Sequence, residues 1–217
     1  QPVSFTGSDL RVVLVGQEKV GKSSSGNTIL EKKEFECQLS SLTLRLRKAE
    51  GVVFGRRVTV VDTPGLFSTQ LSARQVKAAL RNAVQMSSPG PHVFLLTLQL
   101  GRFTMQEQAS MEVLRKMLGA KVCERTMVLF TYGDRLEDTD ISQLIKEDTN
   151  LQEVLRSSSG QFHVFNNKKM GDRRQVGELL QKIDLISQDG SSSFKMESRI
   201  AGMSRSFRII NQQCLRC

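Results

Sequence analysis

Short apolar runs alternate with helical patterns of hydrophobic residues along most of this chain, and their order predicts its architecture. Residues 42–46 alternate leucine with polar side chains, which predicts a half-buried strand that pairs with residues 58–61 in an antiparallel hairpin. Continuous apolar runs typical of buried strands lie at residues 10–15, 58–61, 92–98, 126–131 and 162–165. Helices are expected between the strands, at residues 22–33, 72–86, 104–118, 141–156 and 176–190.

Signals at the helix ends support this division. Thr104 and Glu107 have the spacing of a capping box, and Gly119 stands where such a helix usually ends. Strands that alternate with helices of this length predict an α/β fold, with a mainly parallel six-stranded sheet, one antiparallel edge strand and helices on both faces. We expect an N-terminal extension at 1–9, one domain at 10–189 and a basic amphipathic extension at 190–217.

Composition indicates a globular protein but leaves its partner open. Of the 217 residues, 39% are hydrophobic and 24% charged, and 31 basic against 22 acidic residues give a net charge of +9. This excess is compatible with nucleic acid, an anionic membrane surface or a phosphate-bearing ligand.

The remaining features of composition concern the compartment. No apolar run is long enough to cross a bilayer, the chain does not open on a secretory signal, and its four cysteines lack the spacing of metal ligands. We therefore expect a cytoplasmic protein with reduced cysteines. A start at Gln1 is consistent with a domain excised from a longer protein.

The most specific motif is a phosphate loop. The segment from Gly16 to Ser23 fits the pattern G-x-x-x-x-G-K-[ST] and lies between a predicted strand and a predicted helix. Its glycines let successive backbone N–H groups surround a phosphate, and the helix directs its positive dipole end to the same anion. Lys22 is expected to reach the β- and γ-phosphates, and the Ser23 hydroxyl to bind Mg²⁺. The predicted nucleotide contacts of this loop are Gly16, Lys19, Val20, Gly21, Lys22, Ser23 and Ser24.

A second motif, Asp62-Thr-Pro-Gly65, follows the strand at residues 58–61. Asp62 is expected to hold Mg²⁺ through a water molecule as a Walker-B-type aspartate, and the Gly65 N–H to meet the γ-phosphate. A motif of this kind is usually only a turn when it stands alone. After a strand and downstream of a phosphate loop, it indicates a switch that senses the nucleotide.

Residues 130–134 end another predicted strand, where open α/β sheets bind their ligands. Asp134 can accept hydrogen bonds from guanine N1–H and from the exocyclic amine, a pair of donors that adenine does not present. The ring of Tyr132 could stack on the base. Asn166 follows the last predicted strand and is a candidate for a second base contact. These residues predict guanine recognition.

The order of the motifs resembles the AIG-type family of immunity-associated GTPases, which is related to septins and to chloroplast import GTPases. The most specific likeness lies in residues 90–108, which resemble a box between the family's third and fourth guanine motifs. Further segments that look like family motifs are 62–67, 131–134 and 165–167. The resemblance covers about residues 10–186 and implies a slow GTPase that binds GTP, GDP and Mg²⁺.

The resemblance also implies roles outside the phosphate loop. The family's Mg²⁺-binding switch threonine maps onto Thr43, which is otherwise a strand residue on the exposed face. Leu66 stands where Ras-like enzymes place the glutamine that orients the attacking water, which implies slow intrinsic hydrolysis. Dimerisation across the nucleotide face is implied as well. Arg102 would then act in trans on the transferring phosphoryl group, unless it is a surface arginine or anchors the loop beside Mg²⁺.

Two functions from different classes follow. One is a slow GTPase switch activated by homodimerisation, and the other is a GTP-dependent scaffold whose hydrolysis is incidental. Binding to nucleic acid is not expected, because no RNA-binding motif or row of stacking aromatic residues accompanies the positive charge.

The C-terminal extension carries part of that charge, with five basic residues and one acidic residue between 195 and 217. Its hydrophobic residues, from Phe194 onward, form an imperfect helical stripe. We expect a helix that either docks on the domain or lies peripherally on an anionic intracellular membrane. Cys214 and Cys217 form only a weak prenylation match, because an arginine occupies an aliphatic position.

Overall fold

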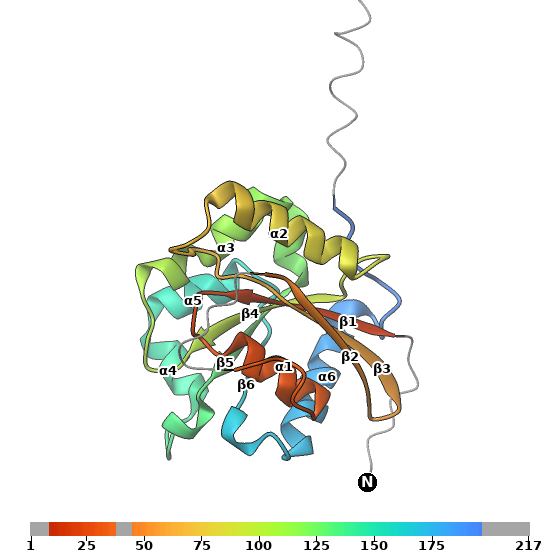
Figure 1. Cartoon of the computed structure of the whole chain (residues 1–217). Helices are drawn as coiled ribbons and strands as arrows, with labels where there is room; N and C mark the ends of the chain where they lie inside the picture. The colour runs from red at the N-terminus through yellow and green to blue at the C-terminus, as the bar shows by residue number, and fades with distance from the viewer. Residues whose placement is uncertain (1–8, 38–44, 197–217) are drawn as a thin grey trace, which may run out of the picture.

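Six strands form one sheet in the order β2-β3-β1-β4-β5-β6 in the computed structural model, which describes residues 9–37 and 45–196 (Figure 1). All neighbouring strands are parallel except β2 and β3, which are antiparallel. The strands are β1 Leu10–Gly16, β2 Arg47–Val53, β3 Arg56–Asp62, β4 Val93–Gln99, β5 Thr126–Thr131 and β6 Phe162–Val164. The fold class predicted from the sequence is confirmed.

Helices cover both faces of this sheet (Figure 1). Their bounds are α1 Lys22–Leu30, α2 Ala73–Met86, α3 Met105–Leu118, α4 Ile141–Glu147, α5 Thr149–Arg156 and α6 Arg173–Ser187. Three short 3₁₀ helices lie at Ala120–Arg125, Gly133–Arg135 and Asn167–Lys169. The expected capping box opens α3, where the Glu107 carboxylate accepts a hydrogen bond from the Thr104 N–H at 2.8 Å.

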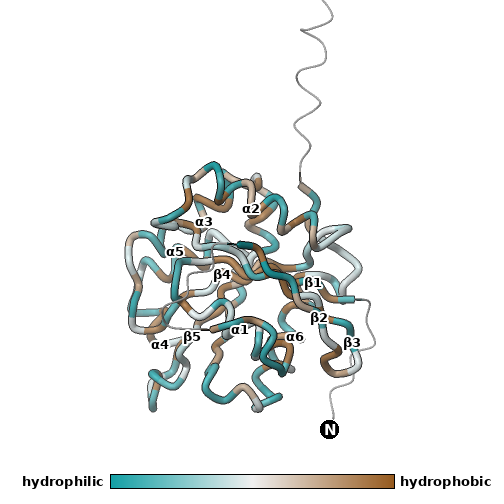
Figure 2. Tube along the Cα trace, in the orientation of Figure 1, coloured by the Kyte–Doolittle hydropathy of each residue, from teal (hydrophilic) through white to brown (hydrophobic). Residues whose placement is uncertain are grey.

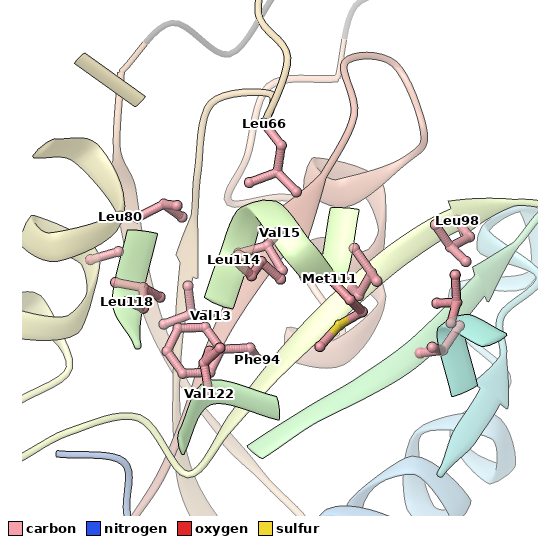
Figure 3. Packing of buried hydrophobic residues seen from close by; sticks show 14 of the residues in the cluster. Val13, Val15, Leu66, Leu80, Phe94, Leu98, Met111, Leu114, Leu118 and Val122 are labelled. Carbon is pink, nitrogen blue, oxygen red and sulfur yellow. The ribbon is translucent and has the colours of Figure 1, made fainter. Parts of the chain in front are cut away.

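Alternate residues of the central strands supply two separate cores. In β1, Val13 and Val15 face the core formed with α2, α3 and α5, whereas Val12 and Leu14 face the core formed with α1 and α6. Figure 2 shows the hydrophobic strands between these two layers, and Figure 3 shows the first core from close by. Strands that are buried on both faces need apolar side chains at successive positions, which is why the sequence signals of β1, β4 and β5 are continuous runs.

The structure corrects the prediction of a strand at residues 42–46. Residues 42–44 lie outside the described residues, Arg45 and Leu46 are not in a strand, and β2 begins only at Arg47. The antiparallel hairpin itself is present, with Phe54 and Gly55 at positive φ in the two-residue turn that joins β2 to β3. β2 escapes detection because it is an edge strand with an exposed face, so its sequence, RKAEGVV, includes charged residues and has no continuous apolar run of the kind seen in the central strands.

The segment after α6 packs onto the domain. Phe194 is buried, its ring lies edge-on 5.2 Å from that of Phe94, and its N–H donates to the Pro91 carbonyl at 2.7 Å. Phe194 is therefore part of a core and not the first residue of an amphipathic helix. The rest of the predicted C-terminal stripe lies beyond residue 196, outside the described part of the chain.

Within residues 9–37 and 45–196, no helix has both the length and the hydrophobicity that crossing a membrane would require.

Candidate nucleotide-binding site

The carboxyl ends of four strands bring the predicted motifs together. The loop after β1 is the phosphate loop, and the segment after β3 begins at Thr63. The segments after β5 and β6 begin at Tyr132 and Phe165. Since β1 lies between β3 and β4, the phosphate loop occupies the position where the strand order reverses, which is the usual ligand site of an open α/β sheet.

The phosphate loop has the backbone that its sequence predicts. Gly16 and Gly21 have φ angles of 142° and 92°, and a Cβ atom on Gly16 would lie 2.5 Å from the Thr97 carbonyl oxygen. Lys19 also has a positive φ. α1 starts at Lys22 behind Gly21, which has no side chain to cap it, so the first N–H groups of the helix are available to an anion.

Lys22 is held inside this loop. Its side chain is buried and donates a hydrogen bond from Nζ to the Gln17 carbonyl. Burial lowers the pKa of the Lys22 ammonium, and the negative charges of Asp62 and Glu18 oppose that shift. A buried ammonium close to the uncapped first turn of α1 is suited to binding a multiply charged phosphate, whose negative charge would compensate the buried positive charge.

Ser23 and Asp62, the two predicted metal ligands within the described chain, are in direct contact. The Ser23 hydroxyl donates to Asp62 Oδ2 at 2.6 Å, and the Asp62 side chain is fully buried. The other carboxylate oxygen, Oδ1, is buried without a hydrogen-bond partner among the residues that the structure describes. A hydroxyl and a carboxylate are the hard oxygen ligands that Mg²⁺ takes, so this pair fits the ion. Thr43 lies outside the described residues.

Arg47 is a component of the site that the sequence patterns do not indicate. Its Nη2 atom lies 3.0 Å from Asp62 Oδ2 and 2.9 Å from the Ser23 oxygen. Only the pairing of β2 with β3, which sets Arg47 opposite Asp62, brings it there.

The segment after Asp62 runs directly against the phosphate loop. The Leu66 N–H donates to the Gly16 carbonyl at 3.0 Å, and a Cβ atom on Gly65 would lie 3.0 Å from the Glu18 backbone nitrogen. This close approach requires glycine at 65. The Leu66 side chain points into the first core, as Figure 3 shows, so it presents no polar group to the site.

A cavity of about 210 Å³ lies beside the phosphate loop, where the base of a nucleotide is expected. It is lined by Gly21, Ser24, Tyr132, Asp134, Asn167 and Lys168. Asp134 Oδ2 lies 2.6 Å from Lys168 Nζ, and this interaction holds the pKa of the Asp134 carboxyl below its usual value. Asp134 is thus an acceptor at the cavity, where guanine N–H donors could replace the lysine. The ring of Tyr132 lines the cavity and also stacks with the Arg135 guanidinium, 4.4 Å from the ring centroid.

The two asparagines after β6 have different positions. Asn166 caps the following 3₁₀ turn, accepting a hydrogen bond from the Lys168 N–H at 3.1 Å, and it does not line the cavity. Asn167 lines it, and its side chain joins Thr28 and Ser25 of α1 at 2.8 and 3.2 Å. The sequence shows two asparagines after the last strand but does not show which of them lines the cavity. A base contact from Asn166 stays a prediction.

Arg102 lies in the exposed turn between β4 and α3. It lines a second cavity, of about 530 Å³, together with Phe103 and the acidic residues Glu147 and Asp148. Its exposure leaves it accessible to another molecule. A role in trans stays a prediction.

Comparisons with known proteins agree with this geometry. A model of the AIG1 family matches residues 10–212. Human GTPase IMAP family member 8 is 31% identical over 199 residues, which are 88% of this chain and 30% of the relative. Immune-associated nucleotide-binding protein 7 of Arabidopsis thaliana is 32% identical over 187 residues, 81% of this chain and 60% of the relative. The chain therefore spans less than two thirds of these relatives.

Solved structures share the fold. Toc33 from Arabidopsis thaliana in complex with GDP and Mg²⁺ superposes with a TM-score of 0.68 at 14% identity, covering 88% of each chain. At that identity the likeness concerns the fold alone.

Proposed function

The chain belongs to the AIG1 family, and on that premise we propose that it binds GTP and GDP together with Mg²⁺ and hydrolyses GTP slowly. The observation that carries this proposal is the contact between Ser23 and the buried Asp62 beside the buried Lys22. Two opposite charges and a hydroxyl lie close together there. A nucleotide phosphate and a divalent cation complement that arrangement.

Each residue of the site has a distinct part in the proposal. Lys22 and the N–H groups of the phosphate loop bind and orient the β- and γ-phosphates. Ser23 and Asp62 would hold Mg²⁺, and the ion would supply positive charge that offsets the negative charge of the phosphates. Gly65 brings its N–H close to the same phosphates, because its backbone packs on the phosphate loop.

Slow hydrolysis follows from residue 66. Leu66 is buried in the core behind the site, so its side chain cannot orient the attacking water as a glutamine does. An arginine from a second copy could supply the missing stabilisation, and the exposed Arg102 is the candidate. For the chloroplast translocon components Toc33 and Toc159, dimerisation is important for GTPase activity. The scaffold alternative with negligible hydrolysis has no observation of its own that favours it.

Base selectivity tests the proposal directly. GDP and GTP should bind far more tightly than ATP, measured by calorimetry with Mg²⁺ present, because only guanine offers the paired donors that Asp134 accepts. Asp134→Ala should remove the preference for guanine and leave the weak ATP affinity unchanged. Asp138→Ala is the matched control, since Asp138 is an exposed aspartate outside the cavity lining. Equal affinity of the wild-type protein for GDP and ATP would contradict the proposal.

A further inference from the structure

Arg47 contacts both of the residues whose chemistry fits Mg²⁺. It is the first residue of β2 and pairs with Asp62 in the antiparallel register, so the two side chains project from the same face of the hairpin. A single guanidinium nitrogen, Nη2, contacts both Asp62 Oδ2 at 3.0 Å and Ser23 Oγ at 2.9 Å. These two oxygens belong to the residues that fit Mg²⁺.

The contact has an electrostatic reason. Asp62 is fully buried, and an ionised carboxylate away from water is costly unless a positive group neutralises it. Lys22 Nζ donates to the Gln17 carbonyl, so Arg47 is the basic side chain that forms the ion pair with Asp62. A divalent cation bound by Ser23 and Asp62 would meet the guanidinium within a few ångströms, and the two positive charges would repel each other.

We propose that Arg47 is a resident cation of the metal site, which neutralises Asp62 while no metal is bound and competes with Mg²⁺ for Ser23 and Asp62. The competition with Mg²⁺ rests on the proposed function. The neutralisation of Asp62 does not, because it concerns the protein without nucleotide.

The exchange requires only rotation of the side chain. Seven residue pairs fix β2 against β3, so the backbone of Arg47 is held in place. The side chain is nevertheless 32% exposed, so the guanidinium can turn toward water. Other contacts already hold it on its outer side, where Nη1 donates to the Glu36 carbonyl at 3.3 Å and the guanidinium lies 5.6 Å from the centroid of the Phe35 ring. Arg47 can therefore leave the two oxygens and keep partners on that side.

A magnesium titration of the complex with fluorescently labelled GDP tests the competition. Mg²⁺ should slow the release of GDP, and the measured quantity is the Mg²⁺ concentration at which half of this slowing is reached. Arg47→Gln should lower that concentration by about tenfold, which corresponds to about 1.4 kcal/mol of competition. Arg47→Lys should give an intermediate value. Arg57→Gln is the matched control, because Arg57 is an exposed arginine on β3 and its removal changes the net charge equally. An unchanged or higher half-effective concentration in Arg47→Gln would overturn the proposal.

Thermal unfolding in EDTA without nucleotide tests the neutralisation of Asp62. The midpoint should fall by roughly 5 °C in Arg47→Gln, less in Arg47→Lys and not in Arg57→Gln. A midpoint in Arg47→Gln equal to that of the control would contradict this part. If Arg47→Gln does not fold, Arg47→Lys decides both measurements. Failure of the wild-type protein to bind labelled GDP at any Mg²⁺ concentration would instead refute the proposed function, and the EDTA measurement would still stand.

Discussion

Lys22 and Asp62 are both buried, and the burial of each is compensated by its surroundings. Asp62 is paired with Arg47 and Ser23, while the lowered pKa of Lys22 reflects burial that Asp62 and Glu18 only partly offset. Such charges are costly to bury and contribute little to stability on balance. Their presence at the carboxyl end of the sheet therefore indicates binding, because a ligand with phosphate and metal would complete the pairing.

The two asparagines after β6 give a prediction at this scale. Asn167→Ala should weaken GDP binding by roughly tenfold, because its side chain lines the base cavity and ties it to α1. Asn166→Ala should leave GDP affinity nearly unchanged and lower the thermal midpoint slightly, since its side chain caps a turn. Calorimetry and thermal unfolding of both variants separate the two effects. A larger loss of affinity in Asn166→Ala would show that Asn166 makes the base contact.

At the scale of elements, the strands that are buried on both faces were predictable and the edge strand was not. β5 matches its predicted bounds, β1 extends one residue further than predicted, and β4 is shifted by one residue at both ends. A continuous apolar run is the pattern expected of a strand buried on both faces. β2 carries a polar sequence that only its pairing with β3 explains. The leucines at 42–46 have the pattern of a strand, yet Leu46 packs on the first core from outside any strand. Periodicity indicates which residues face a core, not which element presents them.

The segment after α6 is joined to the sheet by a buried histidine. His92 Nδ1 accepts the Arg11 N–H at 2.9 Å and Nε2 donates to the Gly190 carbonyl at 3.0 Å, which is the pattern of a neutral ring. Burial, together with the nearby Arg11, lowers the pKa of His92 to about 4. Burial lowers the pKa of His163, which lies in β6, to about 4 as well.

These pKa shifts predict a loss of stability in acid. Between about pH 6.5 and pH 4 the two histidines bind protons in the unfolded chain but not in the folded protein. The free energy of unfolding should therefore fall as the pH decreases through this range. The loss should approach about 3 kcal/mol for each histidine. Urea unfolding between pH 7.5 and pH 4 measures it. The double variant His92→Gln and His163→Gln should show a flatter dependence on pH, and an equally steep one would assign the effect to other groups.

At the scale of the whole molecule, the two ends of the sheet carry different features. The candidate nucleotide site lies at the carboxyl ends of the strands, while the contacts of residues 190–196 lie at the opposite ends, around Pro91 and Arg125. Dimerisation across the proposed nucleotide face would therefore leave residues 190–196 outside the interface. The turn that carries Arg102 is on the nucleotide side, after β4.

This arrangement predicts how turnover depends on concentration. GTP hydrolysis per monomer should rise with protein concentration, and Arg102→Ala should abolish the rise, with a loss of roughly 10³-fold at saturation. Arg156→Ala is a suitable control, because Arg156 is an exposed arginine at the end of α5 and lines neither of the two cavities described above. Flat, negligible turnover accompanied by GTP-dependent oligomers would favour the scaffold.

The sequence by itself determined the fold class, the phosphate loop, the role proposed for Asp62 and the end of the sheet at which the predicted motifs lie. These follow from local rules, since each motif spans a few residues and parallel strands place their carboxyl ends together. Tertiary structure alone decided that Arg47 faces Ser23 and Asp62, that Asn167 and Lys168 line the base cavity, and that Phe194 belongs to a core. Those facts depend on strand register and on contacts between residues far apart in the chain, which no local pattern records.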